Sequence, residues 1–515
     1  MNSSEFEASG FLSDRDIRML AAIRHGIHDS VLPEVSSEMA KFVSAFTVEF
    51  LDKFLVKYTS WPGLLRRQNL RLASVVNQMA ELLAESGCAT PALIATANDA
   101  ALRARQQADQ SLSALEETQR DIDVALEKLV PHLLGDARLR SGATLERMNK
   151  LLREQIGAIQ DTERNFVVTM KQHVHDHQAL VAQQAGVTQE KLQAYLSTRF
   201  PERRNIEITS FYELPGGSSK STVLIDVKDF ENDGITPLVV RLDRIAGTTD
   251  TMVINEVETL RAMVKLGFPA PEIVLVEPDA SKVGLAFIIV RKVDAALGGS
   301  MWAPDRQRCN ADTARDIARL LAKLHALDIH QLNLRGALNS DPAIPPMRGL
   351  IDNIRGLWES CKLGPDGTLE ACLCWLEQNM PPSPARPSFI HADVSFHNIM
   401  VKDHRVAALL DWELSHLGDP NEDLSYCRMC IEQLMPWNEF LAEYRRHGGG
   451  EFSEETGRYF AIWRGVRNAI YTLKGGHSFH SDANPDMRWG FYFTYYRMTL
   501  LEAADKVAEA GMKPG

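Results

Sequence analysis

The spacing of apolar side chains predicts helices over nearly all of the first 185 residues. Apolar residues recur there every three or four positions, which is the period of one helix face. We expect a turn at Trp61-Pro62-Gly63, because proline and glycine interrupt helices. Residues 92–130 contain neither glycine nor proline, and they predict a single long helix that pairs with residues 143–168 as an antiparallel hairpin.

After the helical region the pattern changes to short runs that alternate apolar and polar residues. Such runs are typical of strands, and together they predict a five-stranded antiparallel sheet. The predicted strands are 206–212, 222–227, 237–242, 273–276 and 285–290. A polar stretch at 178–186 marks a boundary. We therefore expect an α+β chain with an all-helical domain at 1–186, a small lobe at 187–293 and a mainly helical large lobe at 294–515.

Composition and charge narrow the class of protein. With 45% hydrophobic and 24% charged residues and a net charge of -12, the chain has the composition of a soluble globular protein and not of a general nucleic-acid binder. Seven cysteines are too few and odd in number for a disulfide framework, so we expect buried free thiols, including Cys427 and Cys430. The N-terminus lacks the features of a signal peptide, and no apolar run approaches ~18 residues. A cytoplasmic protein without membrane or nucleic-acid partners is expected.

The strongest chemical signal lies in the sequence HADVSFHN, where His391, Asp393 and Asn398 have the spacing H-x-D-x-x-x-x-N. After a predicted strand, Asp411 opens the sequence DWE. Phosphoryl transfer uses one carboxylate near the attacking hydroxyl, and a second carboxylate with a neutral oxygen ligand to hold Mg²⁺. Asp393 is the candidate for the first role, and Asn398 with Asp411 for the second. Asp423 would hold the loop by hydrogen bonds. The alternative is an ordinary polar loop between two strands.

The ordered combination of H-x-D-x-x-x-x-N, LDWE, LGDP and a following Asp-Leu pair resembles the aminoglycoside phosphotransferase and choline kinase-like family. It is most similar to the subgroup related to the phosphotransferases that accompany acyl-CoA dehydrogenases. The resemblance covers residues 187–515. It implies a bilobal protein kinase-like fold that uses ATP and Mg²⁺. The subgroup typically has glycine where this chain has Ala392, a difference that could alter how the loop turns.

A glycine-rich turn between the first two predicted strands is the candidate phosphate-binding loop. Its residues are Gly216, Gly217, Ser218, Ser219 and Lys220. In kinases, the backbone N–H groups of such a turn cover the nucleotide phosphates. An ordinary hairpin turn is the alternative. The Lys220 ammonium could contact a phosphate or point into water.

The resemblance implies further nucleotide-binding residues. Arg241, on the third predicted strand, stands where kinases have a lysine, and its planar fork suits phosphate oxygens and a carboxylate. Glu256 is the expected partner and Glu258 the second choice, whereas a surface ion pair without a chemical role is the alternative. Arg291 to Val293 would connect the lobes and offer backbone groups to the adenine.

We therefore expect an ATP- and Mg-dependent kinase that phosphorylates a hydroxyl of a small molecule, with hydroxyacyl-CoA as the leading acceptor by resemblance. The alternatives are a non-catalytic nucleotide-binding scaffold, an aminoglycoside- or choline-type kinase, and nucleotidyl transfer on the same fold. Arg464, Arg467, Tyr471 and Lys474 could line an acceptor pocket, although a helix face explains them equally well. The N-terminal helices carry no catalytic motif, and they could mediate an oligomer or bind a partner protein.

Overall fold

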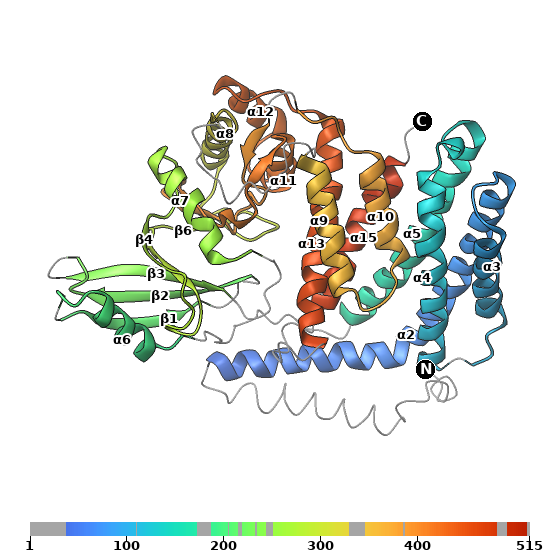
Figure 1. Cartoon of the computed structure of the whole chain (residues 1–515), viewed down its shortest axis with the longest axis horizontal. Helices are drawn as coiled ribbons and strands as arrows, with labels where there is room; N and C mark the ends of the chain where they lie inside the picture. The colour runs from blue at the N-terminus through green and yellow to red at the C-terminus, as the bar shows by residue number, and fades with distance from the viewer. Residues whose placement is uncertain are drawn as a thin grey trace.

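Figure 1 shows the computed structural model of the chain. The described residues are 38–109, 111–171, 187–203, 205–214, 219–231, 234–243, 251–328, 346–384, 387–480 and 492–511. The predicted boundary at 178–186 lies outside them.

The N-terminal region is a set of antiparallel helices, as its apolar period predicts. The elements are α2 (Glu38–Glu85), α3 (Pro91–Gln106), α4 (Leu112–Gly135), the 3-10 turn η4 (Ala137–Leu139) and α5 (Gly142–Lys171). Thr90 caps α3 by accepting a hydrogen bond from the Leu93 N–H, with Pro91 in the first turn. Gly87, with φ 64°, follows the end of α2 in the left-handed conformation that glycine tolerates.

The predicted turn at Trp61-Pro62-Gly63 is wrong, because α2 runs through it. A proline inside a helix removes one backbone hydrogen bond and costs about 3 kcal/mol. Buried leucines continue beyond Pro62, with Leu65 and Leu72 at most 2% exposed. We attribute the unbroken helix to this packing, which local propensity does not report.

The predicted single helix over 92–130 is also wrong, because it is divided into α3 and α4. Residues 107–109 and Ser111 lie outside the helices, and the Ser111 hydroxyl accepts a hydrogen bond from the Ala114 N–H to begin α4. Serine is a favoured N-terminal cap. The local cap therefore outweighs the helix propensity of the surrounding alanine, glutamine and leucine residues.

The small lobe has the predicted five-stranded antiparallel sheet, in the order β1-β2-β3-β5-β4. The strands are β1 (Glu207–Glu213), β2 (Lys220–Lys228), β3 (Ile235–Asp243), β4 (Ile273–Glu277) and β5 (Phe287–Arg291). The helix α6 (Gln189–Arg199) packs on one face of this sheet (Figure 1). The 3-10 turn η5 (Val253–Asn255) leads into α7 (Glu256–Lys265), which shares a second hydrophobic cluster with the other face.

The large lobe is mainly helical, so the expected bilobal kinase-like fold is confirmed. Its short strands are β6 (Ala296–Leu297), β7 (Ser388–Ile390), β8 (Ile399–Lys402), β9 (Arg405–Leu409) and β10 (His416–Gly418), with η7 at Trp412–Leu414. Its helices are α8 (Ala311–His325), α9 (Pro346–Cys361), α10 (Gly367–Gln378), α11 (Asn421–Ile431), α12 (Trp437–Arg446), α13 (Glu454–His480) and α15 (Tyr492–Ala510). The core around the catalytic loop joins α8, α11 and α12 to α7 and β5.

One hydrophobic cluster crosses the boundary expected at residues 186 and 187. It contains buried residues of α2 to α5 together with residues of α9, α10, α13 and α15 (Figure 1). The contact is close where a Cβ on Gly367, at the start of α10, would lie 2.4 Å from the Leu126 Cβ of α4. The buried Gln155 side chain of α5 also donates a hydrogen bond to the Gly367 carbonyl, over 3.0 Å. We propose that the N-terminal helices and the helical lobe share one core.

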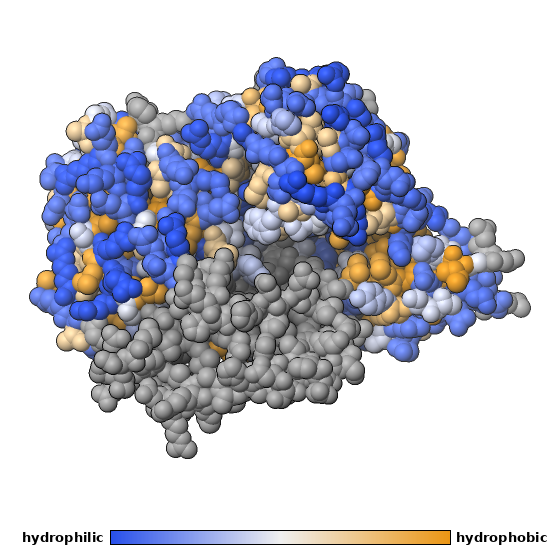
Figure 2. Space-filling model, turned by 180° about the vertical axis from the view of Figure 1, so that it is seen from behind, coloured by the Kyte–Doolittle hydropathy of each residue, from blue (hydrophilic) through white to orange (hydrophobic). Residues whose placement is uncertain are grey.

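Polar side chains cover most of the described surface on the face shown in Figure 2, and apolar residues form small patches there. All seven cysteines are free and buried, as expected. Among the described helices, none has the length and apolar character that crossing a membrane requires.

Candidate functional site

Residues 391–398 form a loop between β7 and β8, and the start of α11 binds the backbone of this loop. The Asp423 carboxylate accepts hydrogen bonds from the backbone N–H groups of His391, over 2.8 Å, and of Ala392, over 2.7 Å. His325 Nε2 lies 3.1 Å from Asp423 Oδ2. Burial would raise the pKa of Asp423, but the hydrogen bond and charge of His325, with contributions from His391, hold it below its ordinary value. The expected supporting role of Asp423 is confirmed.

The loop turns through a left-handed residue at Ala392, whose φ is 65°. This conformation costs an L-residue roughly 1–2 kcal/mol, and glycine adopts it without that penalty. The glycine typical of the resembling subgroup would fit this position easily. In this chain, hydrogen bonds to the surrounding structure must hold Ala392 in place.

Asp393 presents one partnered and one unpartnered carboxylate oxygen. Its Oδ2 accepts a hydrogen bond from the Asn398 side chain over 2.8 Å. Its Oδ1 is buried and accepts no hydrogen bond within the described part of the chain. The Tyr426 phenol lies close by, and burial followed by the charge of Asp393 raises the pKa of Tyr426. A buried oxygen without a donor can accept the hydroxyl proton of a bound molecule.

Asn398 and Asp411 are brought together by the pairing of β8 with β9. Ile399 lies opposite Leu409, and the Leu410 N–H donates to the Asn398 carbonyl over 2.8 Å. The Asn398 side chain turns its nitrogen toward Asp393, so its oxygen is not engaged by that carboxylate. An amide oxygen and a carboxylate beside each other are ligands that suit Mg²⁺.

Arg241 of β3 bridges the small lobe and the Asp411 loop. Its Nη1 lies 2.6 Å from Glu256 Oε2, and its Nη2 lies 2.9 Å from Asp411 Oδ1. The sequence predicted the pairing with Glu256, whose side chain is fully buried, and did not predict the contact with Asp411. The strand that carries Arg241 and the loop that carries Asp411 therefore meet at one point.

Glu413 is a site residue that the sequence analysis did not select. It accepts hydrogen bonds from Ser219, over 2.7 Å, and from Thr251, and its Oε2 lies 3.1 Å from Lys220 Nζ. The predicted alternative in which Lys220 points into water is wrong, because the Lys220 side chain is 4% exposed. The signal was present in the sequence DWE, where Glu413 follows Asp411 by two positions.

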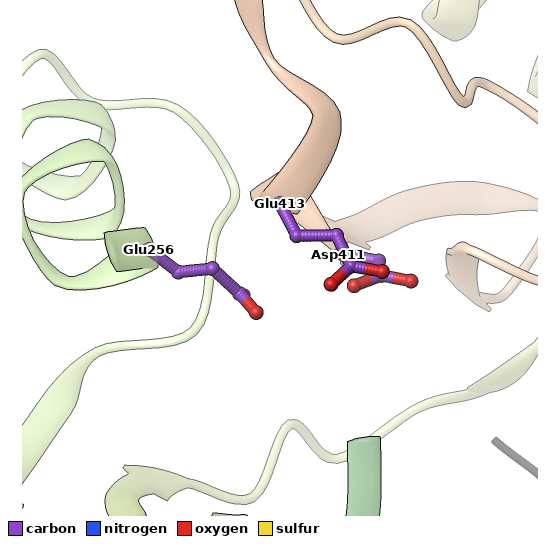
Figure 3. Close-up of side chains that lie close together, drawn as sticks. All are labelled: Glu256, Asp411 and Glu413. Atoms are coloured by element: carbon purple, nitrogen blue, oxygen red, sulfur yellow. The ribbon is translucent and has the colours of Figure 1, made fainter. Parts of the chain in front are cut away.

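Glu256, Asp411 and Glu413 bring three carboxylates together, with oxygen atoms within 4.8 Å of one another (Figure 3). Glu256 points from the start of α7 toward the other two (Figure 3). Burial raises the pKa of Glu256 to about 8, the charges of Asp411 and Glu413 add to the rise, and the charge of Arg241 opposes it. Two cationic side chains already contact the cluster, because Arg241 pairs with Glu256 and Asp411 and Lys220 pairs with Glu413.

The structure describes some, but not all, of the remaining predicted nucleotide-binding residues. Gly216, Gly217 and Ser218 lie outside the described residues. The Arg291 side chain forms surface ion pairs with Glu231 and Glu272, and its N–H donates to the Glu272 carbonyl over 2.9 Å. A nucleotide contact at Arg291 would therefore have to use its carbonyl. The Val293 carbonyl accepts a hydrogen bond from the Ala295 N–H over 2.9 Å, in the connector between the lobes.

The helix α13 lies against the catalytic loop. The Arg467 side chain donates a hydrogen bond to the Ala392 carbonyl over 3.0 Å. Arg467, which the sequence suggested as a residue of the acceptor pocket, therefore also binds the backbone of the catalytic loop. One turn earlier, the Arg464 guanidinium lies 5.1 Å from the Tyr426 ring centroid. Both arginines thus surround the tyrosine that faces Asp393.

Residues 211–460 match the model of the phosphotransferase enzyme family. Acyl-CoA dehydrogenase family member 11 of Gallus gallus is 28% identical over 174 residues, which are 33% of this chain and 22% of that protein. The Rattus norvegicus protein of the same name is 26% identical over 206 residues, 39% of this chain and 25% of its own length. These matches thus span about a quarter or less of the relatives.

Two solved structures are similar to this chain at low sequence identity. A candidate aminoglycoside phosphotransferase from Ralstonia eutropha is 17% identical with a TM-score of 0.47, and the match covers 64% of this chain and 100% of that one. An aminoglycoside phosphotransferase in a ternary complex with AMP-PNP and hygromycin B is 14% identical with a TM-score of 0.40, covering 61% of this chain and 98% of its own.

Proposed function

We propose that this protein transfers the γ-phosphoryl group of ATP to a hydroxyl of a small molecule, with Mg²⁺, because residues 211–460 match the model of the phosphotransferase enzyme family. The observation that carries the proposal is the difference between the surroundings of the two carboxylate oxygens of Asp393. One of its oxygens is fixed by Asn398, while the other is buried and has no donor within the described residues. This arrangement suits a carboxylate that orients an acceptor hydroxyl and takes its proton late.

The residues present fit a Mg²⁺ ion on the nucleotide phosphates. Asn398 turns its side-chain nitrogen toward Asp393, and Asp411 follows Leu410, whose N–H donates to the Asn398 carbonyl. Asn398 and Asp411 would hold the ion, and a Glu413 oxygen lies within 4.8 Å of an Asp411 oxygen. When bound, Mg²⁺ would neutralise charge on the phosphates.

Arg241, Glu256, Ser219 and Lys220 would position the nucleotide. Arg241 is fixed by carboxylates on both sides, so its fork is held at the point where the two lobes meet. Lys220 carries a second buried cation nearby. Gly216, Gly217 and Ser218 would cover the phosphates with their N–H groups, and the backbone of Arg291 and Val293 would bind the adenine.

The acceptor class is proposed from the relatives' names. They are acyl-CoA dehydrogenase family members, so a hydroxyacyl-CoA is the first acceptor to test. Aminoglycosides and choline are the second set. The experiment measures ADP release from Mg-ATP with hydroxyacyl-CoAs, sugars, amino alcohols and aminoglycosides, and identifies each product by mass. An acceptor whose mass increases by one phosphoryl group supports the proposal. ATP binding without phosphorylation of any acceptor and without ATP hydrolysis favours the non-catalytic scaffold.

A further inference from the structure

The Ala392 turn is held on both of its sides. Its N–H donates to Asp423 Oδ1 over 2.7 Å, and its carbonyl accepts from Arg467 Nη2 over 3.0 Å. Both contacts are buried. Since Ala392 has φ 65° and precedes Asp393, these two hydrogen bonds determine the direction in which the Asp393 side chain leaves the turn.

Arg467 is itself fixed by neighbouring groups. Its side chain is 4% exposed, and its Nη1 lies 3.5 Å from Oε1 of Glu422, which is 3% exposed. The same Glu422 oxygen accepts a hydrogen bond from the Trp463 indole over 3.0 Å. Arg467 also lies over the ring of Tyr426, with 5.8 Å from its guanidinium carbon to the centroid. A planar guanidinium can make these contacts together because its donors lie on three nitrogens, whereas an ammonium donates from one nitrogen only.

Glu422 and Asp423 are consecutive residues at the start of α11. Asp423 binds the N–H side of the turn directly, and Glu422 binds the carbonyl side through Arg467 of α13. Two helices therefore hold one strained residue that comes immediately before the candidate catalytic carboxylate. Removal of the donor to a buried carbonyl leaves that group unsatisfied, and the strained turn then has less to hold it.

We propose that Arg467 is a positioning residue that fixes the Ala392 turn and thereby aims the Asp393 carboxylate at the acceptor hydroxyl. The inference rests on the proposed function, because it assigns Arg467 to the same reaction. Arg467 does not act on the substrate through its own charge, since Glu422 and the Ala392 carbonyl already engage its guanidinium. Small displacements of reacting groups lower turnover strongly, so the effect should appear in kcat.

The test compares Arg467→Met with Arg428→Met. Arg428 of α11 also joins α11 to α13, because it donates to Glu454 over 2.7 Å. Within the described residues, no hydrogen bond or ion pair joins Arg428 to the catalytic loop. ADP release is measured with Mg-ATP and the best acceptor of the panel. We expect Arg467→Met to lower kcat by roughly 10–100-fold with the KM for ATP nearly unchanged. Arg428→Met should leave kcat within about twofold, as for surface changes away from the site.

The second arm adds Ala392→Gly to Arg467→Met. Glycine adopts a positive φ without the Cβ penalty, so the turn should depend less on the hydrogen bond from Arg467 to its carbonyl. We expect recovery of roughly fivefold or more in kcat, within the range lost through misplacement. No recovery, together with a kcat loss that matches a fall in Tm, would show that Arg467 only stabilises the fold. If Arg467→Met does not fold, Glu422→Gln replaces it, because glutamine keeps an acceptor for Trp463 and loses the charge that fixes Arg467.

Asp393→Asn is measured beside these variants to separate the two proposals. Loss of turnover in Asp393→Asn with normal kcat in Arg467→Met overturns the positioning role alone. Full turnover in both variants overturns the proposed function and the positioning role with it.

Discussion

Arg241 and Asp411 lie 170 positions apart in the sequence, yet the Arg241 Nη2 is 2.9 Å from the Asp411 Oδ1. The contact joins β3 of the small lobe to the loop after β9 of the large lobe. In this structure the guanidinium neutralises the carboxylate that we propose as a Mg²⁺ ligand. Binding of Mg-ATP should therefore redistribute these charges at the junction of the lobes.

Asp411→Ala should weaken Mg-ATP binding by at least about 10–100-fold. Losses of this size follow even when only a residue that hydrogen-bonds to a metal ligand is removed. Calorimetric titration measures this affinity, with Asp279→Ala in an exposed turn as the matched control. Without Mg²⁺ the variant should bind ATP no more weakly than the unaltered protein, because Arg241 is released from Asp411. Unchanged Mg-ATP affinity would exclude Asp411 as a metal ligand.

Arg241→Met should lower the free energy of unfolding by about 3 kcal/mol, because the buried Glu256 carboxyl loses its cation and must then stay charged without a partner or take up a proton. Adding Glu256→Gln should restore at least about 1 kcal/mol, since the buried carboxyl that carries this cost is then absent. Urea denaturation of the two single variants and the double variant measures the coupling. Strict additivity would mean that the two side chains do not depend on each other for stability.

Asp123 of α4 should make stability depend on pH. Burial, and next the charge of Asp366, raise the pKa of Asp123 to about 7 from an ordinary 3.8. The native protein then binds this proton more tightly than the unfolded chain, so the free energy of unfolding falls as pH rises from about 4 to about 7. Above that range the loss reaches an upper bound of about 4 kcal/mol, from roughly three pKa units.

Asp123→Asn keeps an acceptor for the Gln119 side chain and removes the titrating group. Its unfolding free energy should decline less over this pH range and exceed that of the unaltered protein at pH 8. Asp121→Asn on the same helix, in an ion pair with Arg103, is the control. Parallel pH profiles for the Asp123 variant and the unaltered protein would contradict the raised pKa.

The shared core is tested by Gly367 and Leu126. Gly367→Ala should destabilise the protein by about 1–3 kcal/mol, because the new methyl group would overlap Leu126. Leu126→Ala alone should cost about 2–5 kcal/mol through the cavity it leaves. The double variant should be more stable than the sum of the two losses predicts, since one change makes room for the other. An additive double variant would mean that α4 and α10 are not packed as described.

Cleavage between these regions gives an independent test of the same core. A protease site inserted within residues 178–186 should yield two fragments that stay together in gel filtration under native conditions. The hydrophobic residues of α4 and α10 would otherwise be exposed to water. Separation into two stable folded fragments would support independent domains instead.

Local chemistry accounts for much of what the sequence could predict. Alternation identified the strands, and the spacing of Asp393, Asn398 and Asp411 identified residues that the structure places around one loop. One error came where tertiary contacts decide the outcome, at Pro62, which packing retains within α2. The other came from a local signal that was overlooked, the Ser111 cap that begins α4. Glu413 and Arg467 were harder to assign, because their partners are distant in sequence and no periodicity indicates them.

The central claim is that Asp393 orients the acceptor hydroxyl, and Asp393→Asn tests it most directly. Asparagine keeps the size of the side chain and one acceptor oxygen but loses the charge. The measurement is kcat for ADP release with the best acceptor, accompanied by ATP affinity and Tm, with Asp403→Asn in the β8–β9 turn as the control. We expect kcat to fall by roughly 10²–10⁴-fold with nearly normal ATP affinity. Full turnover in Asp393→Asn, or a loss of turnover that only follows lower thermal stability and weaker ATP binding, would contradict this role.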